Sequence, residues 1–123
     1  MGSARPLTGH SILVLEDEPL VALDVVENLQ NAGADVVVGH TLVDALKLAK
    51  LTEFSAALLD FRLGSDDCAK ICFLLRERGI SFAFYTGYAA IPPPWADTAV
   101  VKKPASPQEL VGSVAALLPK SAH

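Results

Sequence analysis

Short apolar runs recur along this chain, each closed by glycine or by polar residues. They are rich in aliphatic and β-branched residues and show no polar face, which is typical of strands buried on both sides of a parallel sheet. The runs that predict strands are 11–15, 35–39, 56–59, 81–87 and 98–101.

The segments between these runs follow a different period. Apolar residues recur there at spacings of three and four, which predicts amphipathic helices. One helix begins near Leu20 and ends at Gly33, and the next opens at Thr41, with Asp44 as its capping partner. A third presents Cys68 and Cys72 inward, after N-cap oxygens from 65–67.

The last helix has the strongest start signal in the chain. Ser106 is placed as the cap, Pro107 at the first position and Glu109 as the residue that closes a capping box. An apolar stripe then runs to Leu118. By contrast, the stretch Ile91-Pro92-Pro93-Pro94-Trp95 cannot hold a regular helix, because each proline removes a donor and clashes one turn back.

Alternation of strands and helices predicts a single α/β domain with parallel crossovers. We expect this domain to span residues 11–118, after a flexible N-terminal segment (1–10) and before a short tail (119–123). No apolar run reaches the ~18 residues of a membrane span, and the N-terminus lacks a signal-peptide core.

Charge and cysteine content exclude several classes of function. A formal net charge of -4 disfavours binding to nucleic acid or to an anionic membrane through a basic patch. Cys68 and Cys72 share a helix face and are predicted to be core residues, since no Cys/His cluster completes a zinc site. A reducing, cytoplasmic compartment follows. His10 and His40 are interpreted as isolated surface or loop residues.

Polar side chains follow four of the predicted strands. They are Glu16 and Asp17, Asp60, Thr86 and Lys103. The carboxyl ends of parallel strands meet at one sheet edge, where open α/β folds bind ligands. Carboxylates gathered there would repel by about 4 kcal/mol per pair at roughly 4 Å, so a bound cation is expected. An all-oxygen site suits Mg²⁺, with Mn²⁺ as a second candidate, and the hydroxyl and ammonium suit a phosphoryl group.

Taken singly, these residues have simpler interpretations. Glu16 or Asp17 could be a solvated helix N-terminus favoured by the helix dipole, and Thr86 an ordinary strand-end hydroxyl. Lys102 is interpreted as the solvated neighbour of Lys103.

In this order, the motifs resemble the receiver domains of two-component response regulators, from about residue 11 to residue 118. The resemblance rests on Glu16-Asp17 after the first strand, Asp60 after the third, Thr86-Gly87 after the fourth and Lys103-Pro104 after the fifth. It implies a flavodoxin-like (βα)5 three-layer sandwich with a five-stranded parallel sheet of order 2-1-3-4-5. It also implies phosphoryl transfer from a histidine kinase or a phosphotransfer protein onto Asp60.

The resemblance further implies a role for each residue. Asp60 is the nucleophile, and Mg²⁺ is held by Glu16, Asp17, Asp60 and the backbone carbonyl of Arg62. Lys103 pairs with the phosphoryl group, and Thr86, followed by Gly87, moves its hydroxyl onto it. Such a protein catalyses only its own phosphorylation and dephosphorylation and is not an enzyme in the usual sense.

Several features depart from the family pattern. Val100 occupies the position of the usual switch aromatic, for which Tyr85, Tyr88 or Trp95 are candidate substitutes. The family's fourth helix falls in the proline-rich stretch and is expected to be shortened to a turn or loop, which remodels the common output face. Arg62 is hypothesised to lean over the site and to alter the phosphoryl lifetime.

We expect a stand-alone receiver that acts through an unidentified downstream protein, as a phosphorelay intermediate or a phosphate sink; a domain excised from a larger regulator would have the same sequence. A homodimer is compatible with this prediction. The first alternative function is a pseudo-receiver, an interaction module that is never phosphorylated. The second is an aspartate-nucleophile phosphatase, which Arg62 disfavours because that family has an aspartate there.

Overall fold

Strands and helices alternate along the chain, as the hydrophobic pattern predicts. The computed structural model describes residues 5–61, 68–87, 91 and 94–119. In chain order the elements are β1 (Ser11–Leu15), α1 (Pro19–Asn31), β2 (Asp35–Gly39), α2 (Leu42–Leu51), β3 (Ala56–Leu59), α3 (Ala69–Glu77), β4 (Ser81–Thr86), β5 (Ala99–Lys102) and α4 (Pro107–Ala115).

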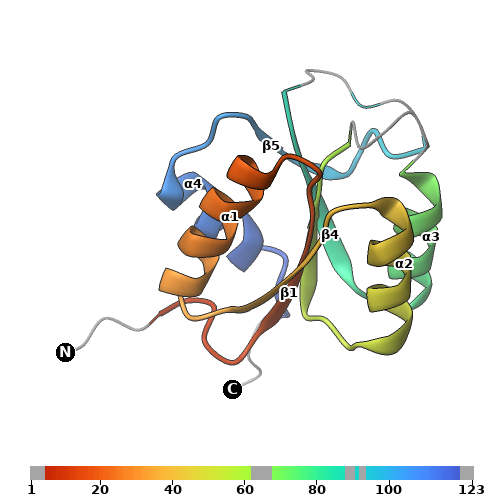
Figure 1. Ribbon diagram of the computed structural model, residues 1–123, viewed down its shortest axis with the longest axis horizontal. Coiled ribbons are helices and arrows are strands. Elements are labelled where there is room, and N and C mark those ends of the chain that lie inside the picture. Colours follow the sequence, from red (N-terminus) through yellow and green to blue (C-terminus); the bar gives the residue numbers. More distant parts are fainter. Residues whose placement is uncertain (1–4, 62–67, 88–90, 92–93, 120–123) are drawn as a thin grey trace.

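The strands form one parallel sheet of order β2-β1-β3-β4-β5, which confirms the predicted flavodoxin-like topology. Helices α1 and α4 cover one face of this sheet, and α2 and α3 cover the other (Figure 1). The molecule is therefore a three-layer sandwich, and each strand end opens onto the same edge.

The central strand β3 explains why the sheet needs helices on both faces. All its residues are buried: Ala57 and Leu59 pack toward α2 and α3, whereas Ala56 and Leu58 pack toward α1 and α4. A fully buried Leu side chain contributes about 1.5–3 kcal/mol relative to leaving it exposed. Alternating side chains along one strand thus join two hydrophobic clusters, and the strand delivers Asp60 at its end.

Local signals place the helix ends where the sequence predicts them. Gly33 has a φ of 104° and follows α1, a conformation that favours glycine. At the start of α4, the Ser106 amide donates to Glu109 Oε1 at 2.9 Å and the Glu109 amide donates to Ser106 Oγ at 3.1 Å. These hydrogen bonds lower the pKa of Glu109 and complete the predicted capping box.

The described residues between β4 and β5 are 87, 91 and 94–98; they form turns, bends and irregular structure and no helix, as the prolines predict. Residues 88–90, 92 and 93, Tyr88 among them, lie outside the described residues. Trp95 is buried: its ring lies 4.9 Å from that of Phe73 and 6.0 Å from that of Phe82. The Arg76 guanidinium lies 4.5 Å from the centre of the same ring. An aromatic side chain therefore covers part of the sheet face here.

The two cysteines are free thiols and are buried in the α2–α3 side of the core, as predicted. Burial raises the pKa of Cys72 to about 12, with Cys68 contributing in the same direction. The predicted cap oxygens at 65–67 lie outside the described residues, and Cys68 is the N-cap of α3. Over the described ranges, every helix is too short or too polar to cross a bilayer.

Candidate functional site

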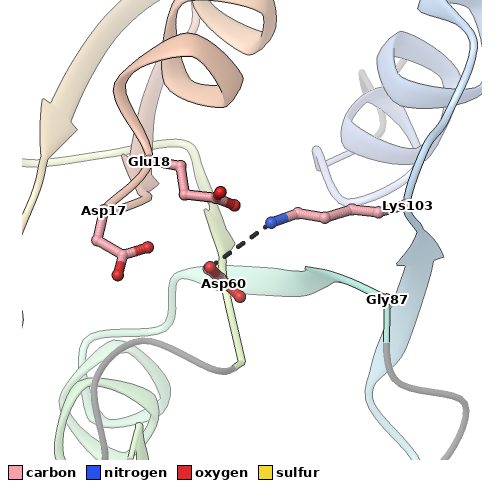
Figure 2. Close-up of a pocket in the computed structure, with 5 residues that line it drawn as sticks. All are labelled: Asp17, Glu18, Asp60, Gly87 and Lys103. Atoms are coloured by element: carbon pink, nitrogen blue, oxygen red, sulfur yellow. Dashed lines mark ion pairs between the residues drawn. The ribbon is translucent and has the colours of Figure 1, made fainter.

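The carboxyl edge of the sheet carries a polar pocket. It has a volume of about 340 Å³ and is lined by Asp17, Glu18, Asp60, Gly87 and Lys103. Figure 2 shows these residues arriving from the β1–α1 loop, the end of β3, the end of β4 and the segment after β5. Residues far apart in sequence therefore meet because each follows a strand of the same parallel sheet.

Asp60 is held at this edge by its own backbone. Its amide donates to the Leu15 carbonyl at 2.9 Å, which extends the β1–β3 ladder by one residue, and its carbonyl accepts from Cys68 Sγ at 3.4 Å. The side chain is 6% exposed and points into the pocket (Figure 2). A carboxylate fixed in this way has a defined position for attack on an incoming group.

Lys103 brings a positive charge to two carboxylates at once. Its Nζ lies 3.0 Å from Glu16 Oε1 and 3.5 Å from Asp60 Oδ2, the second contact being the dashed line in Figure 2. The Lys103 amide donates to the Thr86 carbonyl at 2.9 Å, and its ammonium lies 5.2 Å from the centre of the Tyr85 ring. The side chain is therefore held from its backbone to its charged end.

Burial and pairing act against each other in this ion cluster. Glu16 is 2% exposed, and burial raises its pKa, although hydrogen bonds from Lys103 and from the Glu18 amide (3.2 Å) oppose that change. For Lys103, burial lowers the pKa, but the bond to Glu16 and the charge of Asp60 outweigh burial and raise it. Lys103 is accordingly a charged ammonium at neutral pH.

The acidic residues lie close enough to share one ion. Glu16, Asp17 and Asp60 each place a carboxylate oxygen within 4.8 Å of the others. Opposite ligands of an octahedral Mg²⁺ lie roughly 4 Å apart, and hard oxygen donors are what Mg²⁺ and Mn²⁺ prefer. The donor set of this edge thus fits such an ion, with the exposed Asp17 open to water and the other two carboxylates buried.

The position of Glu16 excludes its simpler interpretation as a solvated helix N-terminus. Helix α1 begins at Pro19 with Glu18 as its N-cap, and its first turn contains no acidic residue. Glu16 is buried beneath the pocket and is no solvated helix end. Glu18, which lines the pocket, was missed by sequence reasoning; its signal was the unbroken acidic run that begins at Glu16.

The remaining predicted residues fall in different places. Thr86 is the last residue of β4 and is fully buried, and Gly87 lines the pocket beside it. Val100 is 43% exposed on β5, one of the two edge strands. Arg62, proposed both as a carbonyl ligand and as a modulator, lies outside the described residues, so neither role is tested.

Of the candidate substitutes for the switch aromatic, two are described. Tyr85 is buried next to Lys103, and its hydroxyl accepts from the Ala105 amide at 3.5 Å. Trp95 belongs instead to the aromatic cluster on the α3 side of the sheet.

Several solved structures share the architecture of this chain. A receiver protein from Sinorhizobium medicae is 24% identical, with a TM-score of 0.77 over 88% of this chain and 93% of that chain. A Thermotoga maritima response regulator, solved in complex with Mg²⁺ and BeF, is 24% identical, with a TM-score of 0.78 over 89% and 99%. The chain has the fold of a response regulator receiver domain.

A third solved structure has the same receiver fold. It is a Burkholderia pseudomallei response regulator described with a phosphorylated aspartic acid, a calcium ion and citrate, 26% identical with a TM-score of 0.73, covering 85% of this chain and 66% of that chain. A scan against protein-family models matches none of them, and a search of curated proteins finds no match. Receiver domains are typically signalling switches, and the acidic cluster described above is compatible with a phosphorylation site.

Proposed function

We propose that this chain is a phosphoacceptor signalling switch in which Asp60 receives a phosphoryl group. The observation that carries the proposal is the position of Lys103. Its ammonium lies within 3.5 Å of both the Asp60 and the Glu16 carboxylates, at the rim of a pocket open to an incoming phosphoryl donor. A buried carboxylate beside a fixed cation and an oxygen-rich ion site has the parts that phosphoryl transfer requires.

The transfer follows from these positions. An Asp60 carboxylate oxygen attacks phosphorus, a new oxygen–phosphorus bond forms and the bond to the donor's leaving nitrogen or oxygen breaks. Lys103 then pairs with a phosphoryl oxygen, and the Thr86 hydroxyl donates to another. Bound Mg²⁺, held by Glu16, Asp17 and Asp60 and by the carbonyl of Arg62, would neutralise charge on the phosphoryl oxygens.

The acyl phosphate resets by hydrolysis, so the chain turns over only its own modification. Gly87 is an exposed lining residue of the pocket beside Thr86, and it is proposed to modulate access to Asp60. Arg62 is proposed to modulate the phosphoryl lifetime. Val100 stands on β5 at the position of the usual switch aromatic, so we propose that the switch of this chain works without an aromatic residue there.

Two relatives by fold support this assignment. The Burkholderia structure is described with a phosphorylated aspartic acid, and the Thermotoga structure with Mg²⁺ and BeF. We transfer the acceptor role to Asp60 and the ion site to the acidic cluster on the strength of the geometry above.

Partners follow from the chemistry. Receiver domains accept phosphoryl groups from histidine kinases, so we propose a sensor histidine kinase or a histidine phosphotransfer protein as donor, in the cytoplasm. The output is proposed to be contact with a downstream protein, from a domain of residues 11–118 that acts alone or as a homodimer.

The competing reading is a pseudo-receiver, and one experiment separates the two. Incubation with acetyl phosphate and Mg²⁺, followed by intact mass spectrometry, is expected to give a single phosphoryl adduct on the wild type. Asp60→Asn and a sample with excess EDTA are expected to give none. If the wild type stays unmodified with acetyl phosphate and with every histidine kinase tried, the pseudo-receiver is favoured. Turnover of an unrelated phosphomonoester would favour a phosphatase.

A further inference from the structure

His40 lies in the turn between β2 and α2, next to the acidic loop. Sequence alone makes it an isolated loop residue, but its Nδ1 lies 3.2 Å from the carbonyl oxygen of Glu16. A carbonyl oxygen can only accept, so Nδ1 carries the proton of this hydrogen bond. The side chain of a residue after β2 thereby reaches the loop that holds two of the proposed metal ligands.

The contact gives the Glu16 backbone carbonyl a hydrogen-bond partner, as its amide already has one. Ladder pairing between β1 and β2 ends at Leu15 and Gly39, one residue before Glu16. The Glu16 amide still donates to the Gly39 carbonyl at 3.1 Å, and the His40 ring binds the Glu16 carbonyl. Both backbone groups of Glu16 are therefore fixed to the same short turn.

This turn is itself rigidly placed. A Cβ on Gly39 would lie 3.0 Å from the backbone nitrogen of Ala45, so β2 and α2 approach as closely as the backbone allows. The next turn residue, Thr41, caps α2 by accepting from the Asp44 amide at 3.1 Å. His40 is held between these two anchors and presents its ring from a fixed backbone.

The carbonyl that His40 binds belongs to the peptide group joining Glu16 to Asp17. Rotation of that peptide would move the Asp17 carboxylate relative to Asp60, although the Glu16 side chain is separately tied to Lys103 and to the Glu18 amide. Among the described residues, no hydrogen bond or ion pair holds the Asp17 side chain, and Asp17 is the exposed member of the carboxylate cluster. Fixing the peptide is therefore the direct way to fix Asp17.

We propose that His40 is a positioning residue for the cation site, holding the Glu16–Asp17 peptide so that the Asp17 carboxylate faces Asp60. The inference rests on the proposed function for the identity of that site. His40 does not touch the ion or the phosphoryl group. It acts through one hydrogen bond to a backbone carbonyl.

The test compares two substitutions of nearly equal shape. His40→Leu has no donor, whereas His40→Asn carries an amide N–H on the atom bonded to Cγ, the position that Nδ1 occupies in histidine. Mn²⁺ alone is titrated into each protein and the free ion is followed by electron paramagnetic resonance. Asp17→Asn identifies the site, and urea unfolding without metal shows that each variant is folded.

His10 supplies a matched control. Its Nδ1 makes a comparable contact with Ser55 Oγ at 3.0 Å, but it lies at the amino end of β1, at the opposite edge of the sheet. We expect His40→Leu to weaken Mn²⁺ binding by about three- to tenfold, the worth of one hydrogen bond. His40→Asn and His10→Leu should stay within about twofold of wild type, on the same scale.

Each remaining outcome overturns the inference. Wild-type affinity in His40→Leu, or equal weakening in His40→Asn and His40→Leu, means that the donated bond does not position the site. If either result accompanies Mg²⁺-dependent labelling of Asp60 by acetyl phosphate, the proposed function stands and only the role of His40 fails. If the wild type binds no Mn²⁺, or if Asp17→Asn binds Mn²⁺ as tightly as the wild type, both the proposed function and the role of His40 are contradicted.

Discussion

At the scale of single residues, Lys103 is the only cation that the described structure places against the buried carboxylates Glu16 and Asp60. Both acids are at most 5% exposed, so water screens their mutual repulsion poorly. Removing one partner of a buried ion pair leaves an uncompensated charge, which costs more than the pair itself contributed. The stability of the ion-free protein should therefore depend on this lysine.

Lys103→Met is predicted to lower the free energy of unfolding by about 1–3 kcal/mol at neutral pH. Lys103 lowers the pKa of Glu16, so the variant raises that pKa further above its ordinary value of 4.5. A group whose folded-state pKa is raised favours folding below its unfolded value and loses that contribution as pH rises. The deficit should thus be smallest below about pH 4.5 and grow as pH increases.

Urea unfolding of Lys103→Met and of Lys102→Met, measured at several pH values, checks this prediction. Lys102 is the exposed neighbour on β5, and its removal should change stability by less than about 0.5 kcal/mol. Equal effects of the two substitutions, or a deficit independent of pH, would show that Glu16 and Asp60 do not need the Lys103 charge.

At the scale of elements, two glycines with opposite surroundings show where the backbone is constrained. Gly39 ends β2, and a Cβ there would lie 3.0 Å from the Ala45 nitrogen and 3.1 Å from its Cα, both backbone atoms that cannot move alone. Gly112 lies inside α4, and a Cβ there would meet nothing within 4 Å. Close packing at the first site and open space at the second predict opposite effects of the same methyl group.

Gly39→Ala is predicted to destabilise the protein by about 1–3 kcal/mol, because the added methyl forces β2 and α2 apart. Gly112→Ala is predicted to stabilise it by about 0.5–1 kcal/mol through helix propensity and a less flexible unfolded chain. Thermal and urea unfolding of the two variants measure both signs. A neutral Gly39→Ala would mean that the β2–α2 turn is not closely packed, which would also weaken the case for a rigidly held His40.

At the scale of the whole molecule, the described part of the β4–β5 connection contributes a buried side chain to the α3 side of the sheet. Trp95 packs between Phe73 of α3 and Phe82 of β4, with Arg76 against its face. It is 4% exposed, whereas Phe73 is 55% exposed. Among the described residues of the β4–β5 connection, Trp95 is the buried one, and Ile91 packs in part against the same cluster.

Trp95→Ala is predicted to lower the free energy of unfolding by about 3–5 kcal/mol, the range for a large aromatic lost from a core. Trp95→Phe keeps an aromatic ring and should lose distinctly less. Phe73→Ala, on the exposed side of the cluster, should also lose less than Trp95→Ala. Circular dichroism in urea measures all three, and a small effect of Trp95→Ala would mean that the connection is held by other contacts.

Most of the fold could be predicted because its signals are local. The apolar run of β3, the glycine after α1 and the capping box of α4 each mark an element within a few residues, and strand limits shifted by no more than one residue, as at Thr98. Strand order is a property of crossovers and not of periodicity, so it came from the family resemblance.

The parts that escaped prediction depend on tertiary contacts. His40 and Glu16 are 24 residues apart, and nothing in a loop histidine reveals which carbonyl its ring will reach. Burial of Trp95 was hidden because the surrounding prolines indicate an irregular connection, and irregular connections are usually exposed. For the site, the edge residues were predictable from strand ends, but the burial of Glu16 and its direct bond to Lys103 required the packed structure.

The central claim is that Asp60, and no other residue, takes up phosphate. After incubation with acetyl phosphate and Mg²⁺, borohydride reduces an aspartyl phosphate to homoserine, which peptide mass spectrometry locates in the sequence. The account predicts homoserine at position 60 in the wild type, and none when Mg²⁺ is omitted or Asp60→Asn is used. Conversion at another acidic residue, or an unchanged Asp60 under full labelling conditions, would contradict it.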